Sequence, residues 1–206
     1  MRSKEAGERL LSLELKGRLI FFATNNFNKF KEAREVLSRH KIAVGMLRVK
    51  TMEIQSESLE EIAKASALEA FQKCSLPVIV EDAGLFVEAL NGFPGPYSSY
   101  VYKTIGNVGL LKLMEGIDDR SAKFQSVIAY HSEELVFPIC FKGEARGQIT
   151  REVREGHSGF GFDPIFKPEK SDKTFAEMSV QEKNRHSHRA KALRKFAKWY
   201  KNLKRQ

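Results

Sequence analysis

The sequence predicts an α/β fold, because apolar strands and amphipathic helices alternate along its first half. Residues 18–23 (R-L-I-F-F-A) are typical of a buried strand, and a turn cluster follows at 24–26. A helix is expected next, since apolar side chains recur at helical spacing at Phe30, Ala33, Val36 and Leu37. A second strand is expected over 42–49. Strand, turn, helix and strand in this order indicate a parallel α/β unit.

A second helix and a third strand continue this alternation. Ser58 and Glu61 have the spacing of a capping box, so a helix is expected to begin there and to end near Cys74. The apolar face of this helix comprises Leu59, Ile62, Ala63, Ala67, Ala70 and Phe71. The β-branched run Val78–Val80 is too short for a helix and therefore predicts a buried strand.

Two adjacent carboxylates, Glu81 and Asp82, come directly after that run, and a loop rich in glycine and proline follows at 92–96. In α/β proteins, a strand that ends in carboxylates and glycine places charged side chains at the mouth of a cleft. The alternative is that both acids are ordinary solvated side chains at a strand end.

The second half of the chain predicts an antiparallel pair of strands. Residues 124–130 and 135–143 are strand-like and flank the polar turn 131–134. Residues 144–150 are expected to continue the second strand of this pair. A helix over 104–114 is the weaker expectation, because glycines interrupt its pattern.

A glycine-rich loop and a last helix complete the predicted elements. Residues 156–166 (G-H-S-G-F-G-F-D-P-I-F) are expected to form the loop. Ser179 and Glu182 have the spacing of a second capping box, which is expected to open the final helix. The apolar stripe of that helix comprises Leu193, Phe196, Ala197 and Tyr200. Residues 1–16 carry no motif and are expected to be an N-terminal extension.

Length and composition favour a globular protein of one domain or of two closely packed lobes. The chain has 206 residues, of which 42% are hydrophobic and 30% charged. No apolar run approaches the roughly 18 residues that span a membrane, and the N-terminus lacks the apolar core of a secretory signal. Cys74 and Cys140 form no CxxC motif, so a reduced, cytoplasmic setting is the default expectation.

The net charge of +9 is concentrated at the C-terminal end. Residues 183–206 contain ten Lys or Arg and no Asp or Glu, whereas the rest of the chain has 25 basic and 26 acidic side chains. This segment indicates either a solvated helix face or a surface for polyanions. Because Phe196, Trp199 and Tyr200 lie between the basic residues, a nucleic-acid or nucleotide binding module is an alternative from another functional class.

A candidate phosphate site lies where the first strand leads into the first helix. Backbone amides at a helix N-terminus favour anions. Hydroxyl and amide side chains with one lysine, as in Thr24, Asn25, Asn26 and Lys29, suit a phosphate chain. The spacing differs from that of a Walker loop. The alternative is a simple N-cap turn beside a surface lysine.

A candidate metal site consists of acids expected after the second and third strands. Glu53 follows the second strand, and Glu81 and Asp82 follow the third. Acids at the same end of neighbouring parallel strands can share one hard cation, and Mg²⁺ prefers one or two carboxylates plus water and phosphate oxygens. The alternative is that these are surface acids.

A candidate site for a planar base lies in the glycine-rich loop. An exposed Phe160 or Phe162 could stack a base beside Asp163, whose carboxylate would accept hydrogen bonds from the base edge. The alternative is that both phenylalanines are buried in the core. On the last helix, Lys183 and Arg189 could contact a phosphate or a carbonyl oxygen.

The order of these motifs is more specific than any one of them. The chain contains T-N-N-x-x-K, then E-I-Q, E-D-A-G-L-x-V-x-A-L-x-G-x-P-G-x-Y-S, G-F-G-F-D-P-I-F, and A-E-M-S-x-x-E-K-N-x-x-S-H-R-x-x-A-L. In this order the five blocks closely resemble the inosine triphosphate pyrophosphatase family, over roughly residues 18–196.

The resemblance implies an elongated mixed sheet with flanking helices, forming two lobes around a central cleft in a single catalytic domain. It also implies a Mg²⁺-dependent homodimer that hydrolyses ITP, dITP and XTP to the monophosphate and pyrophosphate. A related pyrophosphatase acting on other modified nucleotides is the alternative within the same class.

The resemblance also implies roles for individual residues. Asp82 and Lys29 would be catalytic, with Asp82 activating water, and Glu53 and Asp82 would hold the metal ion. Glu81 would then be structural, since neighbouring side chains in a strand point to opposite faces. The substrate would be bound by Thr24, Asn25, Asn26, Phe27, Asn28, Lys29, Ala83, Phe160, Gly161, Phe162, Asp163, Lys183, His188 and Arg189. Many relatives have Gly in place of Asn25 and Ser in place of Ala83.

Overall fold

A computed structural model describes residues 18–52, 54–156 and 159–203, so the predicted extension at 1–16 lies outside the described part. Its elements are β1 (Arg18–Ala23), α1 (Phe27–Ser38), β2 (Ile42–Leu47), α2 (Leu59–Cys74), β3 (Val78–Val87), η1 (Glu88–Leu90), β4 (Pro94–Gly95), α3 (Ser98–Thr104), α4 (Gly106–Leu113), β5 (Ser121–His131), β6 (Ile139–Ile149), η2 (Asp163–Ile165), β7 (Phe166–Pro168), α5 (Val180–His186) and α6 (His188–Leu203).

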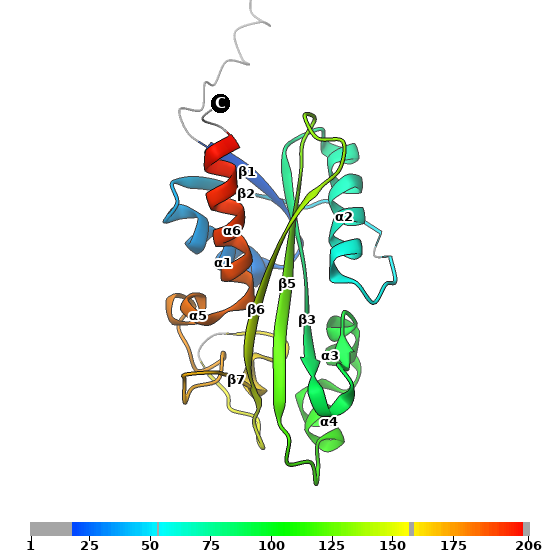
Figure 1. The fold of residues 1–206 in the computed structure, drawn as a ribbon, viewed down its shortest axis with the longest axis vertical. Coiled ribbons are helices and arrows are strands. Elements are labelled where there is room, and N and C mark those ends of the chain that lie inside the picture. Colours follow the sequence, from blue (N-terminus) through cyan, green and yellow to red (C-terminus); the bar gives the residue numbers. More distant parts are fainter. Residues whose placement is uncertain (1–17, 53, 157–158, 204–206) are drawn as a thin grey trace, which may run out of the picture.

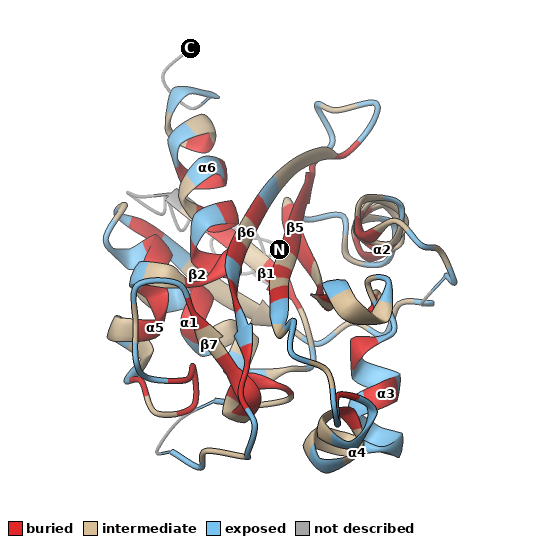
Figure 2. Ribbon diagram, turned by 60° about the horizontal axis from the view of Figure 1, so that its bottom comes forward, coloured by how far each residue is buried: buried red, intermediate tan, exposed pale blue. Residues whose placement is uncertain are grey.

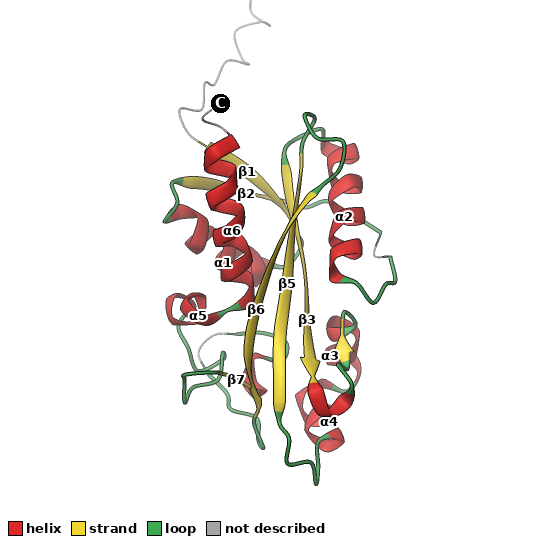
Figure 3. Cartoon of the chain, viewed as in Figure 1, coloured by secondary structure: helices red, strands yellow, loops and turns green. Residues whose placement is uncertain are grey.

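The described strands form one mixed seven-stranded sheet. Its order is β2-β1-β3-β5-β6-β7, with β4 paired to β3. The strands β2, β1 and β3 are parallel, as the strand–helix–strand pattern predicts, and β3, β5, β6 and β7 pair antiparallel. The long strands β3, β5 and β6 run along the long axis of the molecule (Figures 1 and 3). The α/β class and the mixed sheet are therefore confirmed, whereas the two lobes remain a prediction.

Helices cover both faces of the end of the sheet that contains β1 and β2. Helices α1 and α6 pack on one face, over a core that includes Ile20, Ile79 and Ile128. Helix α2 packs on the other face, over Val80 and Val127. A third apolar cluster lies at the opposite end and includes residues of α4, β7 and the second half of β3. Figure 2 shows the buried residues on the sides of the helices that face the sheet.

The third strand is longer than the sequence predicts. Val78–Val80 was expected to end before the two acids, but β3 continues to Val87, so Glu81 and Asp82 lie inside it. The prediction that these acids follow the strand is therefore wrong. The physical reason is that β5 pairs with β3 along its whole length, so long-range backbone pairing overrides the low strand propensity of acids and glycine.

The predicted helices differ from the observed ones near Gly106 and Ser187. The helix expected over 104–114 corresponds to α4, which begins at Gly106 with φ +63°, and the short helix α3 before it was not predicted. The capping box at Ser179 is confirmed, but it opens the short helix α5 and not the final helix. At Ser187 the backbone is extended, with ψ 148°, and α6 begins with the next residue.

A close contact between β6 and α6 fixes the position of the last helix. A Cβ atom built on Gly143 would lie 2.1 Å from the carbonyl oxygen of His188 and 2.5 Å from the amide nitrogen of Ala192. Only a residue without a side chain permits this approach. On the exposed side of α6, Lys191 and Lys195 donate to the carbonyl oxygens of Glu144 and Lys142.

Within the described ranges, no helix is both long enough and apolar enough to cross a membrane.

Candidate active site

The N-terminus of α1 forms directly after β1 ends. Asn26 caps the helix, and its side-chain oxygen accepts from the backbone amide of Lys29 at 3.1 Å. The hydroxyl oxygen of Thr24 accepts from the amide of Asn26 at 3.1 Å. The side chain of Phe27, the first helical residue, is 64% exposed. Thr24 and Asn26 thus order the turn, and the remaining amides of the first helical turn are oriented to bind an anion.

The side chain of Lys29 turns back from α1 onto β3. Its Nζ lies 2.8 Å from Oε2 of Glu81 and donates to the carbonyl oxygen of the same residue at 3.3 Å. The other carboxylate oxygen of Glu81 accepts from Ser126 Oγ at 2.7 Å and from Arg189 Nε at 3.1 Å. Glu81 therefore joins residues of α1, β5 and α6.

The charged contacts continue from Arg189 towards the glycine-rich loop. Nη1 of Arg189 pairs with Oε2 of Glu32 on α1, and Oε1 of Glu32 accepts from Lys183 Nζ at 2.7 Å. Lys183 also donates to Oδ2 of Asp163 at 2.6 Å. The same oxygen of Asp163 accepts from the amide of Phe160 at 2.8 Å. We call the alternating set Lys29, Glu81, Arg189, Glu32, Lys183 and Asp163 the charge chain.

The charge chain contains three cations and three carboxylates, so its formal charges balance. Burial alone would raise the pKa of Glu81, but Arg189 and Lys29 outweigh burial and hold it below its usual range. Burial would lower the pKa of Lys183, but Asp163 and Glu32 raise it, so the ammonium stays charged. Burial and the nearby Glu32 raise the pKa of Asp163. Removal of one member would leave its neighbours as uncompensated buried charges.

The two phenylalanines of the glycine-rich loop have different environments. Phe162 is buried in the core and packs edge-to-face on Tyr102, with ring centroids 5.6 Å apart. Phe160 is half-buried, and Nζ of Lys183 and Cζ of Arg189 lie 4.9 Å and 5.4 Å from its ring centroid. Of these two rings, Phe160 is the one that adjoins the charge chain, whereas Phe162 packs in the core.

His188 lies at the start of α6 next to Arg189. Its ring stacks on Phe124 at a centroid distance of 4.7 Å and an interplanar angle of 11°. Burial and the neighbouring Arg189 lower the pKa of His188 well below its usual value. The imidazole is therefore neutral near pH 7, with one nitrogen that donates and one that accepts.

Asp82 lies on the opposite face of the sheet from Glu81. Side chains alternate along β3, so Ile79 and Glu81 face α1 and α6, whereas Val80 and Asp82 share the face of α2. Asp82 and Ala83 are half-buried. Glu53 lies outside the described residues, so its predicted pairing with Asp82 stays a prediction.

The sheet order corrects one premise of the metal prediction. The acids were expected on neighbouring parallel strands, but β1 lies between β2 and β3. Among the residues that the structure describes, no group of three or more His, Cys, Asp or Glu is placed to hold a metal ion.

Comparisons with known proteins identify the family. Residues 20–199 match the model of the Ham1 family. The chain belongs to the Ham1 family.

Curated Ham1 relatives cover nearly the whole chain. A dITP/XTP pyrophosphatase of Methanopyrus kandleri is 54% identical over 89% of this chain and 96% of its own length. A protein of the same name from Thermococcus kodakarensis is 52% identical over 89% of this chain and 98% of its own. The solved HAM1 protein of Coxiella burnetii is 34% identical, with a TM-score of 0.77 over 90% of this chain and 99% of that chain. The Staphylococcus aureus Ham1 protein gives a TM-score of 0.76 at 31% identity, over 90% of this chain and 100% of that chain.

Two buried polar residues of this Ham1 chain, Glu32 and Ser126, have no recognisable motif in the sequence. Glu32 is 4% exposed and contacts both Lys183 and Arg189, and Ser126 is fully buried against Glu81. In the sequence, Glu32 has the appearance of a surface acid on an amphipathic helix, and Ser126 interrupts an apolar strand without a motif. The one feature in the sequence that relates to the burial of Glu32 is that it directly precedes Ala33, which belongs to the predicted apolar face of the helix.

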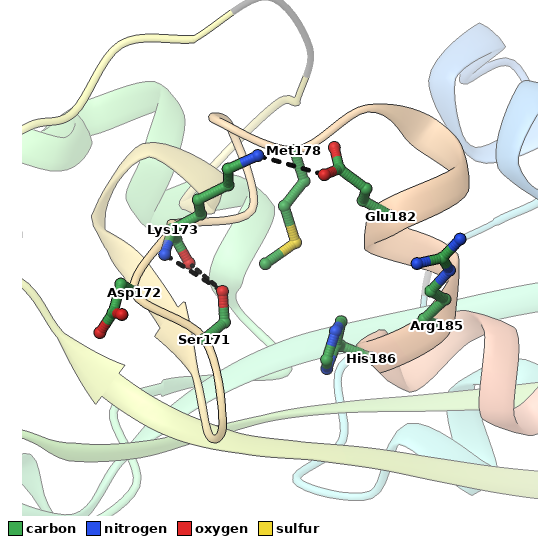
Figure 4. A pocket seen from close by; sticks show the side chains of 7 residues that line it. All are labelled: Ser171, Asp172, Lys173, Met178, Glu182, Arg185 and His186. Carbon is green, nitrogen blue, oxygen red and sulfur yellow. Dashed lines mark hydrogen bonds and ion pairs between the residues drawn. The ribbon is translucent and has the colours of Figure 1, made fainter.

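A surface pocket beside α5 contains none of the predicted site residues. It is lined by Ser171, Asp172, Lys173, Met178, Glu182, Arg185 and His186 (Figure 4). Lys173 and Glu182 pair across it at 3.1 Å. Its charges are thus partly neutralised within the pocket, and we assign it no role in catalysis.

Proposed function

We propose that this chain hydrolyses dITP, ITP and XTP to the nucleoside monophosphate and pyrophosphate. The observation that carries the proposal is the charge chain, which connects the N-terminus of α1 to the loop of Phe160 and Asp163. The ammonium of Lys29 at one end suits a triphosphate, and the ring of Phe160 beside the other end suits a base. The name dITP/XTP pyrophosphatase, which relatives about 50% identical carry, supports the same reaction.

At the phosphate end, the first-turn amides of α1 and the ammonium of Lys29 bind the triphosphate. Asn25, Phe27 and Asn28 contribute to this turn, and all three are exposed. Amides and a lysine that are fixed before the reaction stabilise negative charge as it builds up on the departing pyrophosphate. Positioning and electrostatics supply most of the rate in phosphoryl chemistry.

At the base end, the ring of Phe160 stacks the purine and polar side chains read its edge. Hypoxanthine and xanthine have a carbonyl at C6, which accepts from Arg189 or from the N–H of neutral His188. Adenine has an amino group there, which would face these donors. Because a buried donor without an acceptor is costly, such a site can discriminate by factors on the order of 10⁴. Gly161 and Ala83 complete the surroundings of the nucleotide.

Glu53 and Asp82 are the residues that would hold Mg²⁺. Carboxylate oxygens are the ligands this ion prefers, and Asp82 is a half-buried carboxylate, so the donor chemistry fits. When bound, the ion neutralises charge on the phosphate oxygens. Asp82 would also accept a hydrogen bond from the attacking water and direct it to the α-phosphorus. The pairing of β1 with β3 ends at Ile79, so the nucleotide would lie across the edge of β3 beyond that residue, where it can reach side chains of both faces.

The binding-module alternative loses its structural basis. That alternative was based on aromatic residues that lie between basic ones at the C-terminal end. However, Phe196 and Tyr200 are 0% and 2% exposed and pack in the core. Trp199 is half-buried against Tyr130, with ring centroids 5.3 Å apart. These rings belong to the packing stripe of α6 and offer no stacking platform.

We further propose that the chain is a homodimer and that the surface of α3 and α4 forms the interface. Large apolar side chains gather there and are 42% to 70% exposed, namely Tyr97, Tyr100, Tyr102, Ile105, Val108 and Leu113. Contiguous exposed apolar surface marks interaction sites. Sedimentation of the wild type and of Val108→Asp tests this, and an unchanged sedimentation coefficient would refute the interface.

A nucleotide panel with pyrophosphate detection tests the activity. The expected result is release of pyrophosphate from dITP, ITP and XTP, with Mg²⁺ required and ATP turned over far more slowly. Asp82→Asn should lose turnover without loss of folding. Asp118→Asn, at a fully exposed carboxylate, is the matched control and should keep activity. Near-normal turnover by Asp82→Asn would remove Asp82 from the mechanism, and a preference for other nucleotides would favour the related pyrophosphatase.

A further inference from the structure

We propose that Glu81 is a positioning residue of the pyrophosphatase reaction, which holds Lys29 and Arg189 in fixed geometry relative to each other. This inference rests on the proposed function, because that function places Lys29 at the phosphates and Arg189 at the base. Glu81 acts through these two cations.

The backbone makes Glu81 a rigid anchor. It lies in the middle of β3, where its register partner is Ile128 on β5. Ser126 is two residues before Ile128 and lies on the same face of the sheet, so its hydroxyl reaches Oε1 of Glu81 at 2.7 Å. The Glu81 side chain is 0% exposed. A carboxylate on a paired central strand, with a hydrogen bond from the next strand, has little freedom to move.

The contacts of Glu81 use both of its carboxylate oxygens. Oε1 accepts from Ser126 and from Arg189, and Oε2 lies 2.8 Å from the ammonium of Lys29. Both oxygens are thus enclosed by residues of this chain. Asp82, the neighbouring acid, points to the opposite face of the sheet.

The same contacts give Lys29 a defined direction. Its ammonium meets Glu81 twice, at the carboxylate and at the backbone carbonyl oxygen. An ammonium carries three N–H groups, so at least one remains for a phosphate oxygen. The Lys29 side chain is 20% exposed, so without Glu81 it would be free to turn into solvent. Of its two ion pairs, Arg189 would keep the one with Glu32.

The proposal predicts a loss of turnover without a matching loss of binding. Glu81→Gln keeps the volume of the side chain and removes its charge. A misplacement of about 1 Å at a reacting group can cost about 10²-fold in rate. We therefore expect the kcat for ITP to fall about 30-fold to 100-fold while KM changes less than about 3-fold. Ser126→Ala keeps every charge and should lower kcat by a smaller factor.

A double-mutant cycle separates this role from a purely structural one. Losses caused by Lys29→Met and Glu81→Gln should combine to less than their product in the double variant, because part of the effect of Glu81 passes through Lys29. Glu60→Gln is the matched control, since Glu60 also pairs with two lysines, Lys64 and Lys142, each at 2.6 Å on the surface. It should leave kcat unchanged. Circular dichroism melts establish that each variant is folded. If Glu81→Gln does not fold, the kcat of Ser126→Ala tests the positioning role in its place.

The outcomes distinguish this inference from the proposed function. If Lys29→Met keeps normal turnover, the phosphate site itself is misassigned. If Lys29→Met is inactive while Glu81→Gln and Ser126→Ala keep kcat within about 3-fold of wild type, the positioning role is overturned. It is also overturned if Glu81→Gln raises KM alone, or if the two losses multiply.

Discussion

Replacing Lys183 with methionine tests the energetics of the charge chain. The Lys183 side chain is 2% exposed and lies 2.7 Å and 2.6 Å from carboxylate oxygens of Glu32 and Asp163, which are 5% and 4% exposed. Methionine fills a similar volume but leaves both carboxylates without this cation. Removal of one partner from a buried ion pair costs about 3–5 kcal/mol, so we expect Lys183→Met to lower the free energy of unfolding by this amount near pH 8.

The destabilisation should depend on pH, and its sign follows from linkage. Without Lys183, the pKa of Asp163 in the folded state lies further above its unfolded value, since burial and Glu32 already raise it. The folded variant then binds a proton more readily than the unfolded chain, so it loses stability as pH rises above the unfolded pKa of about 3.9. The cost of the substitution should therefore be smaller at pH 5 than at pH 8.

Urea unfolding at both pH values measures this, with Lys173→Met as the matched control. Lys173 pairs with Glu182 at 3.1 Å, but the two side chains are 55% and 42% exposed. Exposed pairs contribute about 0–1 kcal/mol. If Lys183→Met costs no more than Lys173→Met, or if its cost is the same at both pH values, the reasoning about the buried charges is wrong.

Two further predictions follow from α6. Gly143→Ala would place a Cβ atom 2.1 Å from the carbonyl oxygen of His188, so α6 must shift, and we expect a loss of about 1–3 kcal/mol in urea unfolding together with reduced turnover. Normal turnover by this variant would show that the helix adjusts without moving Arg189. His188→Phe should flatten the pH dependence of stability: because the folded pKa of His188 is lowered, the unfolded state binds the extra proton, and stability falls by up to about 1.4 kcal/mol per pH unit as pH drops below about 6.5. An unchanged slope in His188→Phe would contradict a neutral, buried imidazole.

Local sequence determined the elements whose signals are short-range. The β1–α1–β2 unit follows from hydrophobic periodicity and the Asn26 cap, and the Ser179–Glu182 capping box forms as its spacing predicts. At Ser58 only half of the predicted box forms: Ser58 accepts from the amide of Glu61, but the Glu61 carboxylate accepts from Ser56 at 2.7 Å. The ordered motifs also identified the family, which the match over residues 20–199 confirms.

Only the tertiary structure decided how the charged residues pair. Lys29 and Glu81 are 52 positions apart, and Lys183 and Glu32 are 151 positions apart, so no local pattern relates them. The length of β3 depends on its pairing with β5, and the break at Ser187 separates Lys183 from Arg189. Glu81 shows the difference most clearly. The sequence indicated that Glu81 and Asp82 point to opposite faces of the strand. Only the fold brings Lys29, Ser126 and Arg189 to Glu81. The reason is that a buried carboxylate takes its partners from the elements that pack against it.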